Sequence, residues 1–353
     1  MTKQEKFYNI ELLRFLCAFA VLLWHYAHFL YGIEGVNRLQ QPFYYWFYPF
    51  FTKGYYGVQV FWMISGYIFF RQYRDSIANR NVDFRKFFLR RIARLYPLHI
   101  VTLIIVALLQ PLFFLKNGNF FIYQSNSVKY FILQLFMASH WFPNTVSSFN
   151  EPIWSVSVEI IVYFVFFLHM RFIGSSILST LAILGSALCL LLASGYRDIF
   201  WCTLFFYTGG VITCVQDFFT GIPPEQKRKY SWSFLLLAVE VFLCMAIAYA
   251  DQRFRFLILS AVAFYIILEY IRIPERHQKL VEALGNLTYA SYLIHFPIQL
   301  SIATFCSYIG CAIPFRSPIF FLAFIGGIFL LSRIVFLRFE SVARNKIRQF
   351  FNV

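Results

Sequence analysis

NIELLRFLCAFAVLLWHYAHF, residues 9–29, belongs to an apolar run that extends from residue 9 to residue 31. About 20 apolar residues in a helix cross the hydrocarbon core of a bilayer, so this run predicts a transmembrane helix. It is longer than the apolar core of a signal peptide and lacks a small-residue cleavage site, so we expect it to remain in the mature protein. Runs of the same character cover residues 56–70, 95–115, 152–170, 175–194, 199–215, 232–250, 254–271, 284–308 and 318–337.

The composition also indicates a membrane protein. Of 353 residues, 60% are hydrophobic and 13% are charged, whereas soluble domains are about half apolar and about a quarter charged. We therefore predict an all-α, polytopic integral membrane protein with about ten transmembrane helices. No Pro- or Ser-rich linker or repeat divides the chain, so we expect a single membrane domain over residues 1–353, with its core at roughly residues 7–340, and no soluble accessory domain. The 7 cysteines show no CxxC spacing, which argues against a metal site.

The basic residues predict the orientation in the membrane. The net charge of +15 suggests a polyanion partner only if the basic residues gather on a soluble face, and they lie between apolar runs instead. We therefore expect no nucleic acid partner. With the amino terminus inside, most of the 31 Lys and Arg residues fall in inner segments, which predicts that both termini are cytoplasmic.

Charged side chains inside the first run are candidates for function, because ionisable groups at bilayer depth are costly unless they are paired or face a wet cavity. Glu11 and Arg14 are close enough to pair on one helical turn. Eleven residues separate Arg14 from His25, which places both within about 20° on one helix face and about 16 Å apart along it. This stripe either lines a path through the membrane or is structural, with Arg14 reaching the inner headgroups and His25 bonding a neighbouring helix.

Three further ionisable side chains lie in or near these runs. In EPIWSVSVEIIVYFVF, residues 151–166, Glu159 falls at a depth similar to that of His25, and a buried carboxylate near an imidazole suits general acid–base chemistry. A structural ion pair would give the same pattern. His28 is nearer the outer interface and is interpreted as a belt residue. His295 lies just before Pro297, which frees a backbone carbonyl, and we assign it a structural role.

The densest basic cluster is FRKFFLRRIARLYP, residues 84–97, where Arg90, Arg91 and Arg94 come just before an apolar run. A juxtamembrane cluster of this kind commonly anchors a helix to anionic lipid. The same guanidinium groups also suit the phosphates of a cytoplasmic cofactor. Position in the sequence does not decide between these two roles.

Taken in order, five segments give the chain a resemblance to the acyltransferase 3 family of membrane acyltransferases. They are Arg14 followed by His25, GVQVFWMISGYIF at residues 57–69, RRIARLYPLH at residues 90–99, IWSVSVE at residues 153–159 and LGNLTYASYLIHFP at residues 284–297. Two positions depart from the family pattern: Ile160 replaces a frequent acidic residue, and Glu11 stands where Asp is frequent. A role that needs a second carboxylate beside Glu159 is therefore in doubt.

The resemblance implies a multi-pass protein of the plasma membrane, in bacteria the inner membrane. It also implies an O-acyltransferase that moves an acyl group from cytoplasmic acyl-CoA, by family frequency acetyl-CoA, to a hydroxyl of a glycan or lipid-linked saccharide outside. His25 and Arg14 would be essential, with His25 as general base or transient acyl carrier. We expect Glu159 to orient that imidazole, and Arg90, Arg91 and Arg94 to bind the donor's phosphates, without a metal.

Three other functions fit parts of the same pattern. A transporter or flippase of a saccharide or small molecule would also place ionisable residues along a membrane path, although no inverted repeat is visible. A different type of membrane acyltransferase with one buried histidine would leave the five ordered segments unexplained. A scaffold without activity would leave Arg14, His25 and Glu159 unexplained. The sequence does not indicate an oligomeric state.

Overall fold

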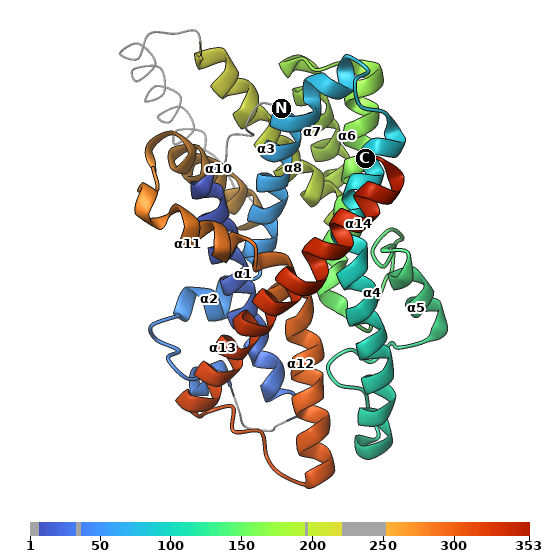
Figure 1. Cartoon of the computed structure of the whole chain (residues 1–353), viewed down its shortest axis with the longest axis vertical. Helices are drawn as coiled ribbons and strands as arrows, with labels where there is room; N and C mark the ends of the chain where they lie inside the picture. Colours follow the sequence, from blue (N-terminus) through green and yellow to red (C-terminus); the bar gives the residue numbers. More distant parts are fainter. Residues whose placement is uncertain (1–6, 33–36, 195–196, 221–251) are drawn as a thin grey trace. The chain divides into compact units, whose positions relative to one another are not determined.

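The computed structural model describes residues 7–32, 37–194, 197–220 and 252–353, and within these ranges it contains helices, turns and loops but no strand (Figure 1). The α-helices are α1 (Tyr8–His25), α2 (Tyr48–Lys53), α3 (Tyr56–Ala78), α4 (Phe84–Asn117), α5 (Val128–Leu135), α6 (Trp154–Leu168), α7 (Ile177–Ala193), α8 (Arg197–Phe219), α10 (Gln252–Tyr270), α11 (Glu275–Gly285), α12 (Thr288–Ile309), α13 (Pro318–Val335) and α14 (Ser341–Phe351). Short 3₁₀ helices are η1 (Tyr26–Leu30), η2 (Arg38–Gln40) and η3 (Glu151–Ile153), and π-helical turns are η4 (His169–Ile173) and η5 (Phe336–Glu340).

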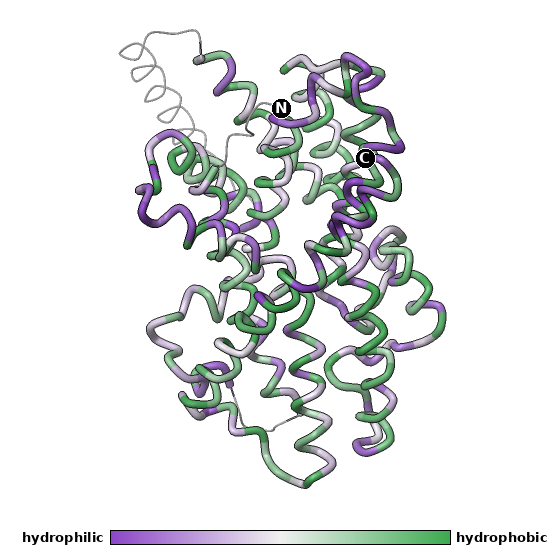
Figure 2. Tube along the Cα trace, viewed as in Figure 1, coloured by the Kyte–Doolittle hydropathy of each residue, from purple (hydrophilic) through white to green (hydrophobic). Residues whose placement is uncertain are grey.

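The expected apolar runs correspond to helices wherever the structure describes them, and the run at 232–250 lies outside the described residues. In the described part of the chain, six helical stretches are long and apolar enough to cross a membrane, and α7 is a shorter apolar helix. The six are Tyr8–Leu30, Phe84–Asn117, Glu151–Ile173, Asp198–Phe219, Thr288–Ile309 and Pro318–Phe351. Figure 2 shows hydrophobic residues along α12 and α13 and hydrophilic residues along α11 and α14. The total of about ten spans and the cytoplasmic termini stay predictions.

Helix boundaries follow from local capping chemistry. Asp83 begins α4, because its carboxylate accepts a hydrogen bond from the Lys86 backbone N–H at 2.6 Å. Ser317 caps α13 in the same way, and Pro318 occupies the first position, where no N–H is needed. Gly118 and Gly310, with φ of 74° and 72°, end α4 and α12 in the left-handed conformation that glycine adopts without strain.

The chain forms two compact units, each assembled from separated segments. The first unit comprises residues 1–10, 59–82 and 162–278, and the second comprises residues 11–58, 83–161 and 279–353. The expectation of a single membrane domain stays a prediction. All the candidate site residues belong to the second unit: Arg14, His25, Arg90, Arg91, Arg94 and Glu159.

In the second unit, α4 packs against α12, and α14 packs against α4. Leu103 and Val106 on α4 meet Phe296 and Leu300 on α12 in a buried apolar cluster. Helices α13 and α14 join through η5 into one continuous helical stretch, seen in red in Figure 1. Arg14 of α1 bonds Thr288 at the first position of α12, so α1 lies beside this helix pair.

In the first unit, α7 packs against α8, and α8 packs against α10. Aromatic rings pack in the core: Phe69 stacks on Tyr163, with 4.3 Å between ring centroids, and meets Phe206 edge to face, with 5.4 Å between centroids. Gly66 lies so close to the Phe206 carbonyl that a Cβ would collide with it. The glycine therefore permits α3 and α8 to approach closely.

Candidate active site

Arg14 and His25 both contact α12, which confirms that their spacing of eleven residues places them on one face of α1. Nη2 of Arg14 donates to Oγ1 of Thr288 at 3.2 Å, and the His25 carbonyl accepts a 2.9 Å bond from Nε2 of Gln299. Thr288 and Gln299 are also eleven residues apart. Arg14 meets Thr288 at the start of α12, and His25 at the end of α1 meets Gln299 further along α12. The two helices therefore run side by side in the same direction.

Arg14 is held by α1 and α12 together. Its Nη1 lies 3.0 Å and 3.2 Å from the two carboxylate oxygens of Glu11, which confirms the pairing expected within one turn. Gly285, just before α12, leaves room for that carboxylate, because a Cβ there would overlap it. The Arg14 side chain is 15% exposed. The guanidinium is therefore held by a carboxylate of its own helix and a hydroxyl of α12.

Two further imidazoles lie beside His25. The ring centroid of His295 is 4.8 Å away, with 30° between the ring planes, and that of His28 is 4.9 Å away. If His25 and His295 were both protonated, charges 4.8 Å apart would repel by about 3 kcal/mol at an effective dielectric constant of about 20. The cluster is therefore suited to hold one proton at a time.

Gln299 organises this cluster from within α12. It is fully buried, and besides its bond to the His25 carbonyl it accepts, through Oε1, a 3.0 Å hydrogen bond from Nδ1 of His28. His28 thus belongs to a buried polar cluster and differs from the belt residue that we expected. The difference arises because η1 tightens the chain after His25 and turns His28 towards α12.

His295 has one nitrogen engaged and one that is not. Nδ1 lies 3.2 Å from the Ser291 carbonyl, while Nε2 is buried without a hydrogen-bond partner among the described residues. Pro297 cannot donate to the Leu293 carbonyl, and Asn150 donates to that carbonyl instead at 3.2 Å. This bond allows α12 to continue through the proline, which keeps His295 and Gln299 on one rigid helix.

Glu159 lies in the same unit with a different immediate neighbour. It is 8% exposed on α6, and its carboxylate interacts electrostatically with the Tyr292 phenol. Tyr292 shares a 2.8 Å hydrogen bond with Oγ of Ser155, and its ring centroid lies 6.2 Å from that of His295. The arrangement therefore links Glu159 to the imidazoles by way of Tyr292.

Of the three arginines in the basic cluster, Arg94 lies within electrostatic range of Arg14. Glu340, at the end of η5, interacts with both of them and is 4% exposed. Arg90 and Arg91 are half-buried on the same helix, α4. The end of α1 near Arg14 is therefore rich in positive charge, balanced in part by two carboxylates.

Comparison with known proteins identifies the relatives of this chain. The sequence model of the acyltransferase 3 family, described as an acyltransferase domain, matches residues 7–337. The chain belongs to the acyltransferase 3 family. It is also similar to the acyltransferase MdmB of Streptomyces mycarofaciens, with 30% identity over 129 residues, which is 35% of this chain and 30% of that protein. No solved structure matches.

The structure also adds polar groups that the sequence did not single out. Nε2 of His140 lies 3.4 Å from Oε1 of Glu151, and both side chains are mostly buried. The other Glu151 oxygen accepts a 2.8 Å bond from the Ser148 backbone N–H. Burial, with the nearby charge of Glu151, raises the pKa of Tyr123 well above its ordinary value, so Tyr123 stays a hydrogen-bond donor.

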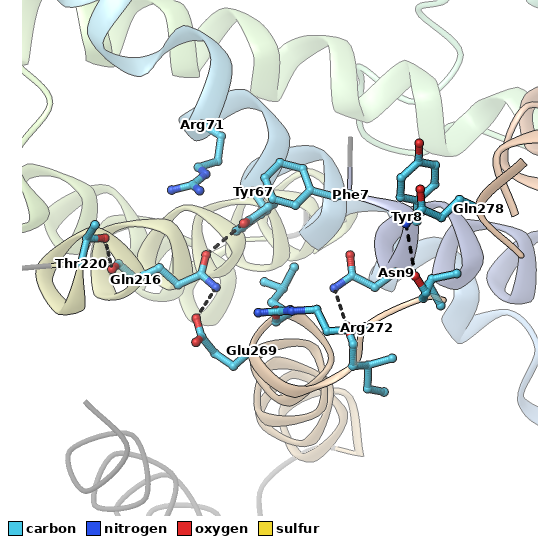
Figure 3. Close-up of a pocket in the computed structure, with 13 residues that line it drawn as sticks. Phe7, Tyr8, Asn9, Tyr67, Arg71, Gln216, Thr220, Glu269, Arg272 and Gln278 are labelled. Atoms are coloured by element: carbon cyan, nitrogen blue, oxygen red, sulfur yellow. Dashed lines mark hydrogen bonds between the residues drawn. The ribbon is translucent and has the colours of Figure 1, made fainter. Parts of the chain in front are cut away.

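A separate cavity of about 440 Å³ lies within the first unit of this acyltransferase 3 protein (Figure 3). Tyr67 donates to Gln216 at 2.9 Å, and Gln216 donates to Glu269 at 2.7 Å along one wall. Its two arginines are already engaged: Arg71 with Asp217 at 3.0 Å and Arg272 with the Leu268 carbonyl at 2.8 Å. No candidate site residue lines this cavity, and no described group of His, Cys, Asp or Glu is arranged to hold a metal ion.

Proposed function

We propose that this membrane acyltransferase moves an acyl group, acetyl in the simplest case, from cytoplasmic acyl-CoA to a hydroxyl at the outer side. The acceptor is a glycan or a lipid-linked saccharide, and the membrane is the plasma membrane, in bacteria the inner membrane. The observation that carries the proposal is the parallel pairing of α1 with α12, which joins Arg14 to Thr288 and His25 to Gln299.

The donor's shape fits this arrangement. Acyl-CoA has an anionic nucleotide and a thin pantetheine arm that ends in the thioester. Arg14 lies near Arg94, and guanidinium groups there attract phosphates. Arg90 and Arg91 come from the same helix and contribute to the same binding. The rise of about 16 Å from Arg14 to His25 matches an arm that reaches the imidazoles while the nucleotide stays at the basic end.

The chemistry falls to the imidazole cluster. His25 acts on the reacting groups, either as general base towards the hydroxyl or as the group that briefly carries the acyl chain. Glu159 supports the cluster through Tyr292 and Ser155, because its carboxylate acts on that phenol. Arg14 stabilises charge at the donor end, where its own position is fixed by Glu11.

The central experiment measures acyl transfer by the purified protein in lipid vesicles with acyl-labelled acetyl-CoA. The label should appear in a lipid-linked saccharide fraction, with release of CoA, and His25→Gln should reduce transfer by at least about 100-fold, as expected for loss of a base or nucleophile. His169→Gln is the matched control, since His169 is a buried histidine of the other unit that bonds Tyr207 at 3.2 Å. Full activity of His25→Gln would refute the proposal, and saccharide movement without CoA release would identify a transporter.

A second experiment separates donor binding from lipid anchoring. Arg91→Ala should raise the KM for acetyl-CoA several-fold at an unchanged amount of protein in the membrane. Arg272→Ala removes a guanidinium of the other unit and should leave KM unchanged. A loss of membrane-inserted protein at constant KM would instead assign Arg91 to lipid. Sealed vesicles of both orientations test sidedness, since externally added donor should be used only where the cytoplasmic face points outwards.

A further inference from the structure

His295 presents a buried nitrogen to which the acyl transfer proposed above assigns no task. Because the Ser291 carbonyl only accepts hydrogen bonds, Nδ1 of His295 carries the hydrogen and Nε2 keeps its lone pair. Nε2 has no hydrogen-bond partner among the described residues, and it is shielded from solvent, since the residue is only 1% exposed. Leaving such an acceptor unpaired is costly. Buried His99 and His169 also leave one nitrogen unpaired, so what distinguishes His295 is its position, with its ring centroid 4.8 Å from that of His25.

The position of this nitrogen is well defined. The Nδ1 contact sets the orientation of the ring, and Asn150 pairs the carbonyl that Pro297, two residues further on, leaves free within α12. On the facing helix, the His25 ring centroid lies 4.8 Å away. The two rings come from different helices, and the bond that orients the His295 ring uses Nδ1 and leaves Nε2 free.

Acyl transfer through an acyl-imidazole needs two separate groups. Once a nitrogen of His25 carries the acyl group, that ring cannot also remove the proton from the attacking hydroxyl at the same atom. A second base must therefore lie within a few ångströms of the acyl carbon. His295 lies beside His25 and has a lone pair at Nε2 that no hydrogen bond in the described residues uses.

We propose that His295, through Nε2, is the base that accepts the proton of the acceptor hydroxyl, while His25 carries the acyl group. The inference rests on the acyl transfer proposed above and assigns the roles of its two imidazoles. It makes His295 a catalytic residue, in contrast to the structural role that we expected from the sequence.

The reaction then proceeds in balanced steps. First, a ring nitrogen of His25 attacks the thioester carbon; the C–N bond forms, the C–S bond breaks and CoA leaves as a thiolate. Next, the acceptor oxygen attacks the acyl carbon; the C–O bond forms, the C–N bond breaks and the hydroxyl proton moves to Nε2 of His295. Finally, His295 releases this proton to solvent and the thiolate takes one up, so that the products are the ester and CoA.

Other titratable and charged groups surround the two rings and enter any pH profile of the reaction. Those near His25 are His28 and Arg38, and those on the side of His295 are Tyr292 and, through Tyr292, Glu159. For this reason the test compares the two half-reactions at one pH and does not depend on the shape of a pH profile.

The test uses His295→Gln and His295→Asn in the full-length protein in lipid vesicles, with His25→Ala beside them. The first half-reaction is measured as CoA released in a single turnover without acceptor, together with label bound to protein. The second is measured as discharge of that label to the lipid-linked saccharide fraction of the host membranes. Hydroxylamine serves as a further probe, since it discharges an acyl-imidazole without needing a base.

In the His295 variants, CoA release should stay within about two-fold of wild type, while discharge to saccharide falls by about 100-fold or more. Acylated protein should accumulate and still react with hydroxylamine, whereas His25→Ala should form none. The proposal is overturned if both half-reactions fall together, if neither falls in the variant that retains wild-type thermal stability, or if the wild type forms no acylated protein. Absence of transfer to any saccharide by the wild type would instead refute the proposed function.

Discussion

Gln299 provides a sharp test of the candidate site, because it bonds two of the three clustered histidines at once. In Gln299→Leu, the His25 carbonyl loses a donor at 2.9 Å and Nδ1 of His28 loses an acceptor at 3.0 Å. Leucine has a similar volume, so no large cavity is created. Both partner groups are left unpaired within the protein interior.

The expected loss of stability follows from these two bonds. Hydrogen bonds between membrane helices contribute about 0.6 kcal/mol on average, and buried bonds in proteins generally about 1 kcal/mol. The two bonds together therefore give a loss of roughly 1–3 kcal/mol once the unpaired groups are included. The bond to the His25 carbonyl also positions the end of α1 that carries the imidazole, and misplacing a catalytic group by about 1 Å costs up to about 100-fold in rate. We expect transfer to fall by about 10- to 100-fold.

Gln110 supplies the matched control for this experiment. It is also fully buried in the second unit, and its two hydrogen bonds, both 3.0 Å, go to the backbone of Phe121. Gln110→Leu should lose similar stability while transferring the acyl group at a much higher rate per folded molecule than Gln299→Leu. Thermal unfolding in detergent gives the stability, and labelled acetyl-CoA gives the rate. Equal rates in the two variants would show that Gln299 contributes only to folding.

Three further predictions concern groups around the site. Gly285→Ala should push the Glu11 carboxylate away from Arg14 and lower transfer about ten-fold in the labelled assay; wild-type activity would show that the pairing does not matter. Asn150→Leu leaves the carbonyl freed by the helix proline unpaired and should lower the unfolding free energy by about 1–2 kcal/mol in thermal melts, and an unchanged melt would contradict this. Glu340→Gln removes a buried negative charge from the basic end and should lower the KM for acetyl-CoA a few-fold; an increase in KM would count against donor binding there.

The sequence predicted those features of the site that depend on one helix. The common face of Arg14 and His25 follows from 3.6 residues per turn, and the pairing of Glu11 with Arg14 follows from their spacing of three. The apolar runs likewise predicted where helices form, because lipid-compatible helices are long and uniformly apolar. These properties are local, so a single sequence contains them.

The features that the sequence did not predict all depend on contacts between distant segments. His28, His295 and Gln299 become neighbours only because α12 packs in register beside α1. The pairing of His140 with Glu151 likewise depends on how the chain folds back between these two residues. Hydropathy indicates which faces are apolar, but it does not determine which polar side chains meet across an interface.

The matching intervals on α1 and α12 constrain how such a protein changes over time. A residue inserted between Arg14 and His25 would rotate one end of the helix by about 100° relative to the other and break either the contact to Thr288 or that to Gln299. A compensating insertion would have to occur in the partner helix. The distance along α1 between the Arg14 guanidinium and the imidazoles is thus constant. A change in bilayer thickness has to be accommodated by the segments that flank these contacts.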